Sequence, residues 1–238
     1  MEAEDNTVGS LGEHQVLKRQ REILIGTILG DAWLQRTGRR SARLRLEHSE
    51  KQKDYIFWKY EELKTLMQDQ PKRIERFNPR FNKTYVYYRC QSHSSPTLGR
   101  YRQYFYDEAG RKRVPEQIEK LLRSPLSLAV WYMDDGHYYA RDKVAFIYLP
   151  NYTEEELSRL CKALGLNFGV EPKLIYKKGH PCLYFPRSET VRLHAIIGGH
   201  VIESMKYKTP LDPVTTEGEL PEDSGMESRR RAPDLELG

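Results

Sequence analysis

The sequence predicts an α+β protein made of two related halves around a pseudo-twofold axis. Three observations lead to this prediction. The order helix–strand–helix–strand–strand–helix occurs twice, with a period of roughly 100 residues. Each pass opens with an apolar helix that ends on an aspartate. Each pass also contains strands in which polar and apolar residues alternate, as expected for antiparallel sheets that are covered on one face.

The first pass opens at residues 15–34, which we predict to form one or two helices, because polar and apolar residues recur there at helical spacing. Residues 41–48 alternate between apolar and charged side chains and predict a half-buried strand. The other elements predicted for this pass are a helix over 51–68, strands over 74–77 and 84–92, and short helices over 98–107 and 115–122.

The second pass repeats this order after residue 125. Thr153 and Glu156 have the spacing of a capping box and predict where a helix begins. Ser188 is the predicted cap of the last helix. The predicted elements are helices over 127–135, 153–164 and 188–197, and strands over 143–149, 174–178 and 181–185.

The chain has 238 residues, which is enough for one large domain or two small ones. We expect an acidic extension over 1–13, a first half over 14–124, a second half over 125–214 and a disordered tail over 215–238. An aromatic content of 11% argues against disorder of the whole chain. No apolar run approaches the roughly 18 residues of a membrane span, so the sequence excludes an integral membrane protein.

Charge is unevenly distributed along the chain. The formal net charge is +5, but both ends are acidic and the stretch between them is strongly basic, above all over residues 36–113. A basic body indicates a polyanionic partner, and nucleic acid fits best. A solvated surface that is merely rich in Lys and Arg remains the alternative at this point.

Two apolar segments carry the chemical signal, namely LIGTILGDA at 24–32 and LAVWYMDDG at 128–136. Helices so apolar all round must be buried, and Gly26 and Gly30 would allow a partner backbone to approach closely. If the two helices pair in parallel, Asp31 and Asp135 converge at one end. Their repulsion would be relieved by a divalent cation with oxygen ligands, usually Mg²⁺. Taken singly, either acid could simply end an apolar helix.

Together the two segments resemble the LAGLIDADG homing endonucleases in their single-chain, two-motif form. Residues 28–32 and 125–136 resemble the subgroup of the yeast mitochondrial omega-intron endonuclease, and the resemblance covers roughly residues 15–212. It implies two αββαββα halves, with the motif helices paired at the interface. It also implies that the curved antiparallel sheets form a saddle that binds DNA in the major groove.

The resemblance also implies site residues. Asp31 and Asp135 are expected to bind the catalytic metals, with the carbonyl groups of Gly30 and Asp134 completing the coordination. The Asp134 side chain is expected to be structural or helix-capping. Lys112 and Lys208, each shortly before a proline, match lysines that act near the scissile phosphates. Contact with the DNA backbone alone is the alternative for both lysines.

Basic and polar residues of the predicted strands and of the loop at 36–40 are candidates for DNA contacts. Glu47 matches a position near the metal-bound water in this family, although an ordinary strand residue is an equal alternative. His48 and His137 are set aside as ligands. The candidates are Arg36, Arg39, Arg40, Arg43, Arg45, Glu47, Arg73, Arg76, Tyr87, Arg89, Lys143, Lys173, Lys177 and Lys178.

The function that we predict is a monomeric, site-specific double-strand DNA endonuclease. It would hydrolyse phosphodiesters with Mg²⁺, for which Mn²⁺ can substitute, and leave short 3′ overhangs in a long asymmetric target. An RNA maturase that assists splicing of a group I intron and a non-cleaving DNA-binding protein are the alternatives. Three unpaired, widely spaced cysteines and no transit peptide favour a reducing compartment, either an organelle or a bacterial cytoplasm.

Overall fold

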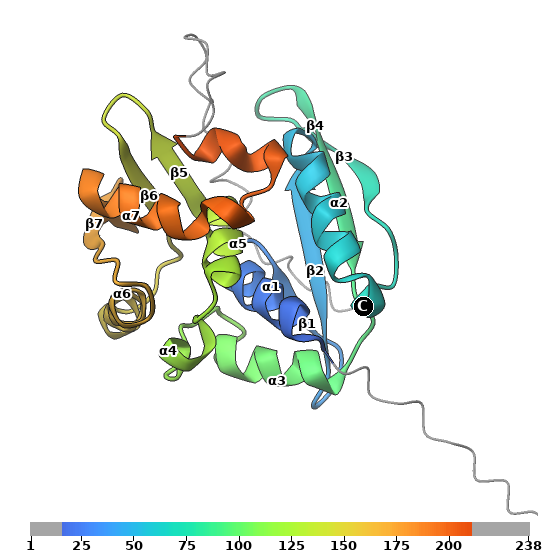
Figure 1. Cartoon of the computed structure of the whole chain (residues 1–238). Coiled ribbons are helices and arrows are strands. Elements are labelled where there is room, and N and C mark those ends of the chain that lie inside the picture. Colours follow the sequence, from blue (N-terminus) through green and yellow to red (C-terminus); the bar gives the residue numbers. More distant parts are fainter. Residues whose placement is uncertain (1–15, 211–238) are drawn as a thin grey trace, which may run out of the picture.

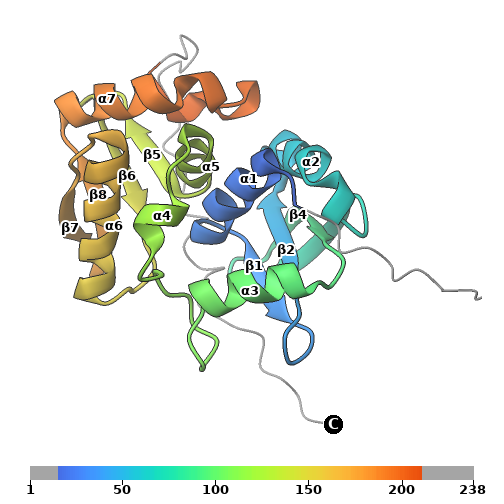
Figure 2. The same ribbon diagram turned by 60° about the horizontal axis from the view of Figure 1, so that its bottom comes forward.

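The computed structural model describes residues 16–210, so the predicted acidic extension and disordered tail lie outside the described residues. The two halves follow one another in the chain and lie side by side (Figures 1 and 2). The first half contains α1 (Lys18–Leu29), β1 (Trp33–Arg36), β2 (Ala42–Ser49), α2 (Lys53–Glu62), β3 (Lys72–Asn78), β4 (Lys83–Gln91), α3 (Pro96–Phe105) and α4 (Ile118–Leu121). The second contains α5 (Pro125–Asp135), β5 (Gly136–Tyr139), β6 (Val144–Tyr148), α6 (Glu154–Phe168), β7 (Lys173–Lys177), β8 (His180–Phe185) and α7 (Arg187–Ile197).

Each half contains one four-stranded antiparallel sheet, and the two sheets have the same topology. The strand orders are β1-β2-β4-β3 and β5-β6-β8-β7. The predicted fold class, with two αββαββα halves, is confirmed. The elements predicted from the sequence do not include β1 and β5, because each has only four residues and follows its motif helix almost directly. In particular, the first helix was predicted to reach residue 34, whereas α1 ends at Leu29.

The motif helices α1 and α5 pack against each other between the two halves. Ser127 donates a hydrogen bond to the Glu22 carbonyl (2.8 Å), and a Cβ on Gly26 would overlap the Ser127 carbonyl oxygen and the Val130 side chain. A Cβ on Gly30 would overlap Asp134. Because these contacts advance together along both helices, α1 and α5 run in parallel and end at the same place. Their close approach depends on glycine, since any side chain at either position would push the helices apart.

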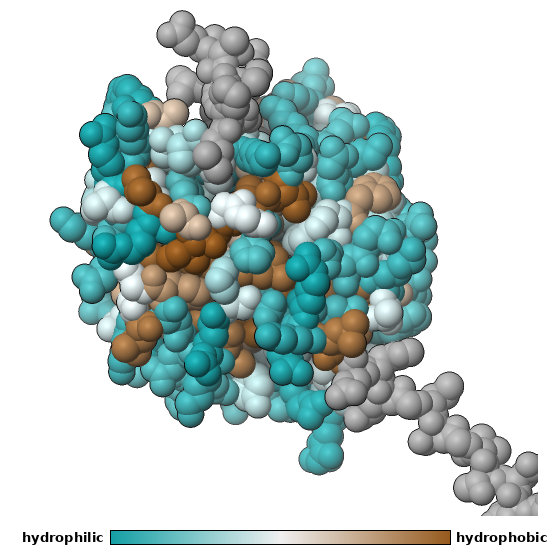
Figure 3. All heavy atoms as spheres, viewed as in Figure 1, coloured by the Kyte–Doolittle hydropathy of each residue, from teal (hydrophilic) through white to brown (hydrophobic). Residues whose placement is uncertain are grey.

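Within residues 16–210, the helices lie on one face of each sheet and none covers the other face, which we call the uncovered face (Figure 2). Alternate residues of β2 are buried beneath helices α2 and α3, while Arg43, Arg45 and Glu47 between them point to the uncovered face. Viewed as in Figure 1, the surface is largely hydrophilic with separate hydrophobic patches (Figure 3). Within residues 16–210, no helix is both long and apolar enough to cross a bilayer.

Two caps were predicted from the sequence, with different outcomes. Thr153 caps α6, and its capping box with Glu156 is present. Ser188 does not cap α7. That helix already begins at Arg187, with Pro186 at the N-cap position, which puts Ser188 inside the first turn.

Candidate active site and nucleic-acid interface

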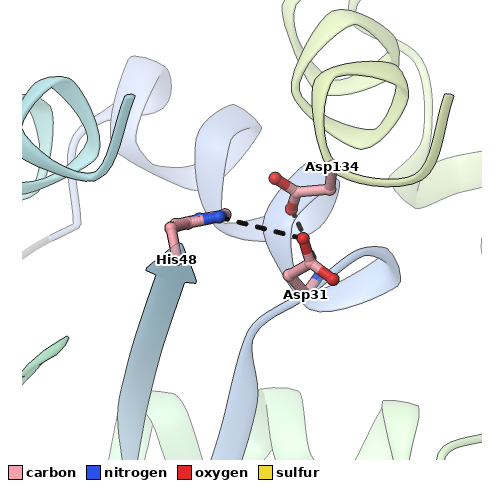
Figure 4. Close-up of side chains that lie close together, drawn as sticks. All are labelled: Asp31, His48 and Asp134. Carbon is pink, nitrogen blue, oxygen red and sulfur yellow. Dashed lines mark hydrogen bonds and ion pairs between the residues drawn. The ribbon is translucent and has the colours of Figure 1, made fainter. Parts of the chain in front are cut away.

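The carboxyl ends of α1 and α5 bring three aspartates together. Asp31 follows the C-cap of α1, while Asp134 and Asp135 form the last residues of α5. A carboxylate oxygen of Asp31 lies within 4.8 Å of ligand atoms of Asp134 and His48, and the three side chains point toward one another (Figure 4). Asp135 is buried, whereas the Asp31 side chain is 26% exposed. The helix pairing therefore brings the Asp31 carboxylate next to that of Asp134, while Asp135, the partner predicted from the motifs, is the following residue of α5.

Lys112 and Lys208 occupy matching places beside these helix ends. The Lys112 ammonium donates to the carbonyl of Gly30 (2.5 Å), the residue before the motif aspartate of the first half. The Lys208 ammonium donates to the carbonyl of Asp134 (3.1 Å), the residue before the motif aspartate of the second half. Both predicted lysines thus lie at pseudo-equivalent positions. Each places a positive charge next to one motif acid.

The Asp134 side chain is fully engaged inside the protein. One oxygen accepts a hydrogen bond from Lys59 (2.6 Å), while the other accepts from the Thr27 hydroxyl (3.2 Å) and the Asp31 backbone N–H (3.1 Å). The Lys59 and Asp134 side chains are both wholly buried. Asp134 therefore joins α5 to the end of α1 and holds the backbone of Asp31, in keeping with the structural role expected for its side chain.

Lys59 of α2 is the centre of this buried network, and the sequence analysis missed it. Besides Asp134, its ammonium contacts the Thr27 hydroxyl (2.7 Å) and His48 Nε2 (3.1 Å). The only signal was a lysine within the apolar stripe of a predicted helix, which would ordinarily be assigned to the solvent face.

His48 is a neutral member of the network. Burial, together with the nearby Lys59 charge, lowers the pKa of His48 to about 4. Its Nδ1 contacts Gln52 Oε1 (3.1 Å), so both ring nitrogens have partners. Asp31, His48 and Asp134 lie close enough to share a metal ion. However, the atoms of His48 and Asp134 that could bind a metal already form hydrogen bonds with Lys59, Thr27 and Gln52. Asp31 is the partly exposed member of the three.

The uncovered face of the first sheet carries most of the predicted arginines. Glu47 accepts hydrogen bonds from Arg76 (2.6 Å) and Arg89 (2.7 Å) and so organises this face. Burial raises the pKa of Glu47, but the hydrogen bonds from Arg76 and Arg89 outweigh that effect and hold the pKa below its ordinary value. Arg45 lies over the ring of Trp33. Tyr87 lies beneath Arg76 on the same face.

Three predicted DNA-contact residues are placed differently from the expectation. Arg73 pairs with the buried Tyr88 and lies on the opposite face of the sheet from Arg76. Lys143 and Lys178 are turn residues with positive φ (55° and 51°) and do not belong to the strands predicted for them. Lys173 and Lys177 do lie in β7. Arg36 ends β1, and Arg39 and Arg40 are exposed in the loop that follows.

Comparison with known proteins agrees with this architecture. The sequence profile of the LAGLIDADG DNA endonuclease family matches residues 21–193. The probable intron-encoded endonuclease 1 of Wickerhamomyces canadensis is 26% identical over 196 residues, which cover 80% of this chain and 84% of that protein. The DNA endonuclease I-ChuI of Chlamydomonas applanata is 26% identical over 208 residues, covering 80% and 94%.

Two further proteins are similar to this chain, one in sequence and the other in its solved structure. Protein RecA of Mycolicibacterium flavescens is 29% identical over 210 residues, and this chain spans about half (47%) of its length. Among solved structures, the homing endonuclease I-WcaI bound to its DNA recognition sequence has the same fold, with a TM-score of 0.75, 24% identity, and coverage of 82% of this chain and 88% of that one. The family profile covers most of the described residues and both motifs, so the chain belongs to the LAGLIDADG DNA endonuclease family.

Proposed function

We propose that the protein cleaves both strands of one long, asymmetric double-stranded DNA target. The observation that carries this proposal is that a motif acid stands at the end of each paired helix and that a lysine bonds the carbonyl group just before each acid. A protein that only binds DNA has no need of converging carboxylates, whose repulsion must be offset. One chain supplies both halves of the site, which supports action as a monomer.

The oxygen donors at this interface suit a hard divalent cation. Asp31 and Asp135 would hold the metal, and the carbonyl groups of Gly30 and Asp134 lie beside them. We propose Mg²⁺, with Mn²⁺ as a substitute, since carboxylate and carbonyl oxygens suit both ions. When bound, the metal lowers the pKa of the attacking water and offsets charge on the phosphate.

The protein's own groups position the substrate around that centre. Lys112 and Lys208 provide one positive charge on each side of the helix pair and would stabilise charge on the two scissile phosphates. Arginines on the uncovered face of the first sheet would bind bases and phosphates of the flanking duplex. Hydrolysis of one phosphodiester on each strand would leave short 3′ overhangs.

Cleavage of a plasmid library with a randomised target, in the presence of Mg²⁺, tests the proposal. We expect the wild-type chain to yield one cut sequence and the Asp31→Asn and Asp135→Asn variants to yield none. Lys112→Met and Lys208→Met serve as second variants and should slow cutting while DNA binding persists. Binding to DNA without any cut would contradict the proposal, as would cutting that both asparagine variants retain. Splicing of a host intron with and without the protein would reveal maturase activity.

A further inference from the structure

The two sheets are equivalent in topology but differ sharply in the chemistry of their uncovered faces. The strand registers align the two halves: Trp33 pairs with Arg45, and His137 pairs with Phe146. Trp33 and His137 each stand two residues after a motif aspartate. Arg45 in the first half therefore corresponds to Phe146 in the second.

The same alignment extends to the neighbouring positions. Glu47 corresponds to Tyr148, because each stands two residues further along its strand. Glu47 pairs with Arg89, whereas Tyr148 pairs with Cys182. The charged group at the centre of the first face is thus replaced by aromatic and thiol side chains at the centre of the second.

These aromatic side chains form one cluster, in which Tyr139 is exposed, Tyr148 and Tyr184 are half-buried and Phe146 is buried. Phe146 contacts the rings of Tyr139, Tyr148 and Tyr184, with ring centroids 5.1, 6.3 and 5.2 Å away. The hydroxyls of Tyr139 and Tyr148 are hydrogen-bonded to each other (3.1 Å), so part of their hydrogen-bonding capacity is already used within the cluster. We call Tyr139, Phe146, Tyr148 and Tyr184 the aromatic face.

Lys177 is the cation nearest the centre of the aromatic face. Its ammonium lies 3.3 Å from the centroid of Phe146 and 4.6 Å from that of Tyr139. A duplex laid on this face would offer phosphates that attract the ammonium away from the rings. The rings would then meet the base edges in the groove.

Major-groove chemistry distinguishes the two faces. Arginine pairs with the O6 and N7 acceptors of guanine, whereas apolar side chains contact the C5 methyl group of thymine. We infer that the aromatic face reads its half of the target through thymine methyl groups, so that this half is A·T-rich, while the arginines on the uncovered face of the first sheet read guanines. This inference rests on the proposed function for its ligand, double-stranded DNA, and names the composition of the two half-sites.

Binding of chemically altered duplexes by the full chain tests the inference. The bound sequence is first selected from randomised duplexes with the Asp31→Asn/Asp135→Asn variant, so that cutting does not interfere. Each thymine is then replaced by deoxyuridine, which lacks only the methyl group. We expect each contacted methyl that is lost from the A·T-rich half to weaken binding about three- to fivefold, as burial of one such group predicts. As the matched control, 7-deazaguanine, which lacks N7, should weaken binding by about fivefold or more in the guanine-bearing half.

Protein variants assign each half of the target to a sheet. Tyr148→Ala should abolish the deoxyuridine effect and leave the 7-deazaguanine effect intact, and Arg45→Ala should do the reverse. Deoxyuridine tolerated at every thymine, guanine contacts of equal strength in both halves, or selection of no defined sequence would each overturn the inference. Because these are binding measurements, methyl-dependent binding without cleavage by the wild-type chain would contradict only the endonuclease proposal.

Discussion

Replacing Lys59 with methionine is the most informative perturbation of the buried network. Methionine fills the space of the lysine stem but removes the ammonium that bonds Asp134, Thr27 and His48. The Asp134 carboxylate would stay buried, with one oxygen stripped of its 2.6 Å partner. Removing one member of a buried ion pair costs about 3–5 kcal/mol, and both side chains here are fully buried. We therefore expect Lys59→Met to lower the free energy of unfolding by about that amount.

A double-mutant cycle in urea measures this coupling. Asp134→Asn keeps the shape of the side chain and removes its charge. In the Lys59→Met background it should recover part of the lost stability, giving a coupling free energy on the order of 2 kcal/mol or more. Lys64→Met is a matched control, since Lys64 pairs with Glu61 on the exposed surface and should cost less than about 1 kcal/mol. Additive effects, or a cost for Lys59→Met no larger than for the control, would refute the role assigned to Lys59.

Three further predictions concern packing, charge and pH. Gly26→Ala should lower the free energy of unfolding by about 2 kcal/mol or more in urea, because the methyl group would meet the backbone of α5; an unchanged midpoint would contradict this packing. Glu47→Gln should free Arg76 and Arg89 for phosphates and strengthen non-specific DNA binding with a steeper salt dependence; weaker binding to random duplexes would speak against it. Burial lowers the pKa of His194 from 6.5 to about 4, so its neutral form stabilises the fold fully above pH 6.5, and this contribution is lost as the pH falls toward 4. The stability advantage of wild type over His194→Gln should shrink across this window by up to about 3 kcal/mol, and a constant difference would refute the assignment.

Much of the fold could be predicted from periodicity and repetition. The motif helices were identified because a wholly apolar helix can only be buried, and the glycines indicated close approach, but the parallel orientation of the pair is established by the structure. The short strands β1 and β5 could not be found by alternation, because four residues contain too few alternations to separate a strand from the end of a helix. Their existence follows instead from the pairing of each with the next strand.

The candidate site was predicted unevenly for physical reasons. The sequence segments that contain Asp31, Asp135, Lys112 and Lys208 are recognisable. In the structure, each of the two lysines bonds the carbonyl group just before one of the two aspartates. Lys59 was missed because burial of an ammonium depends on Asp134, which is 75 residues away in the sequence. The separation of Arg73 from Arg76 could have been predicted, since residues three apart in a strand lie on opposite faces.

The most direct measurement of the central claim is a crystal structure of the full chain with its cut target DNA and Mn²⁺, in which anomalous scattering locates the metal. We expect anomalous peaks at ligand distance from the carboxylates of Asp31 and Asp135, with the hydrogen bond between Lys59 and Asp134 preserved. A metal ligated by His48 and the Asp134 side chain, with Lys59 displaced, would contradict the site. DNA bound on the helix-covered side, away from Lys112 and Lys208, would contradict it as well.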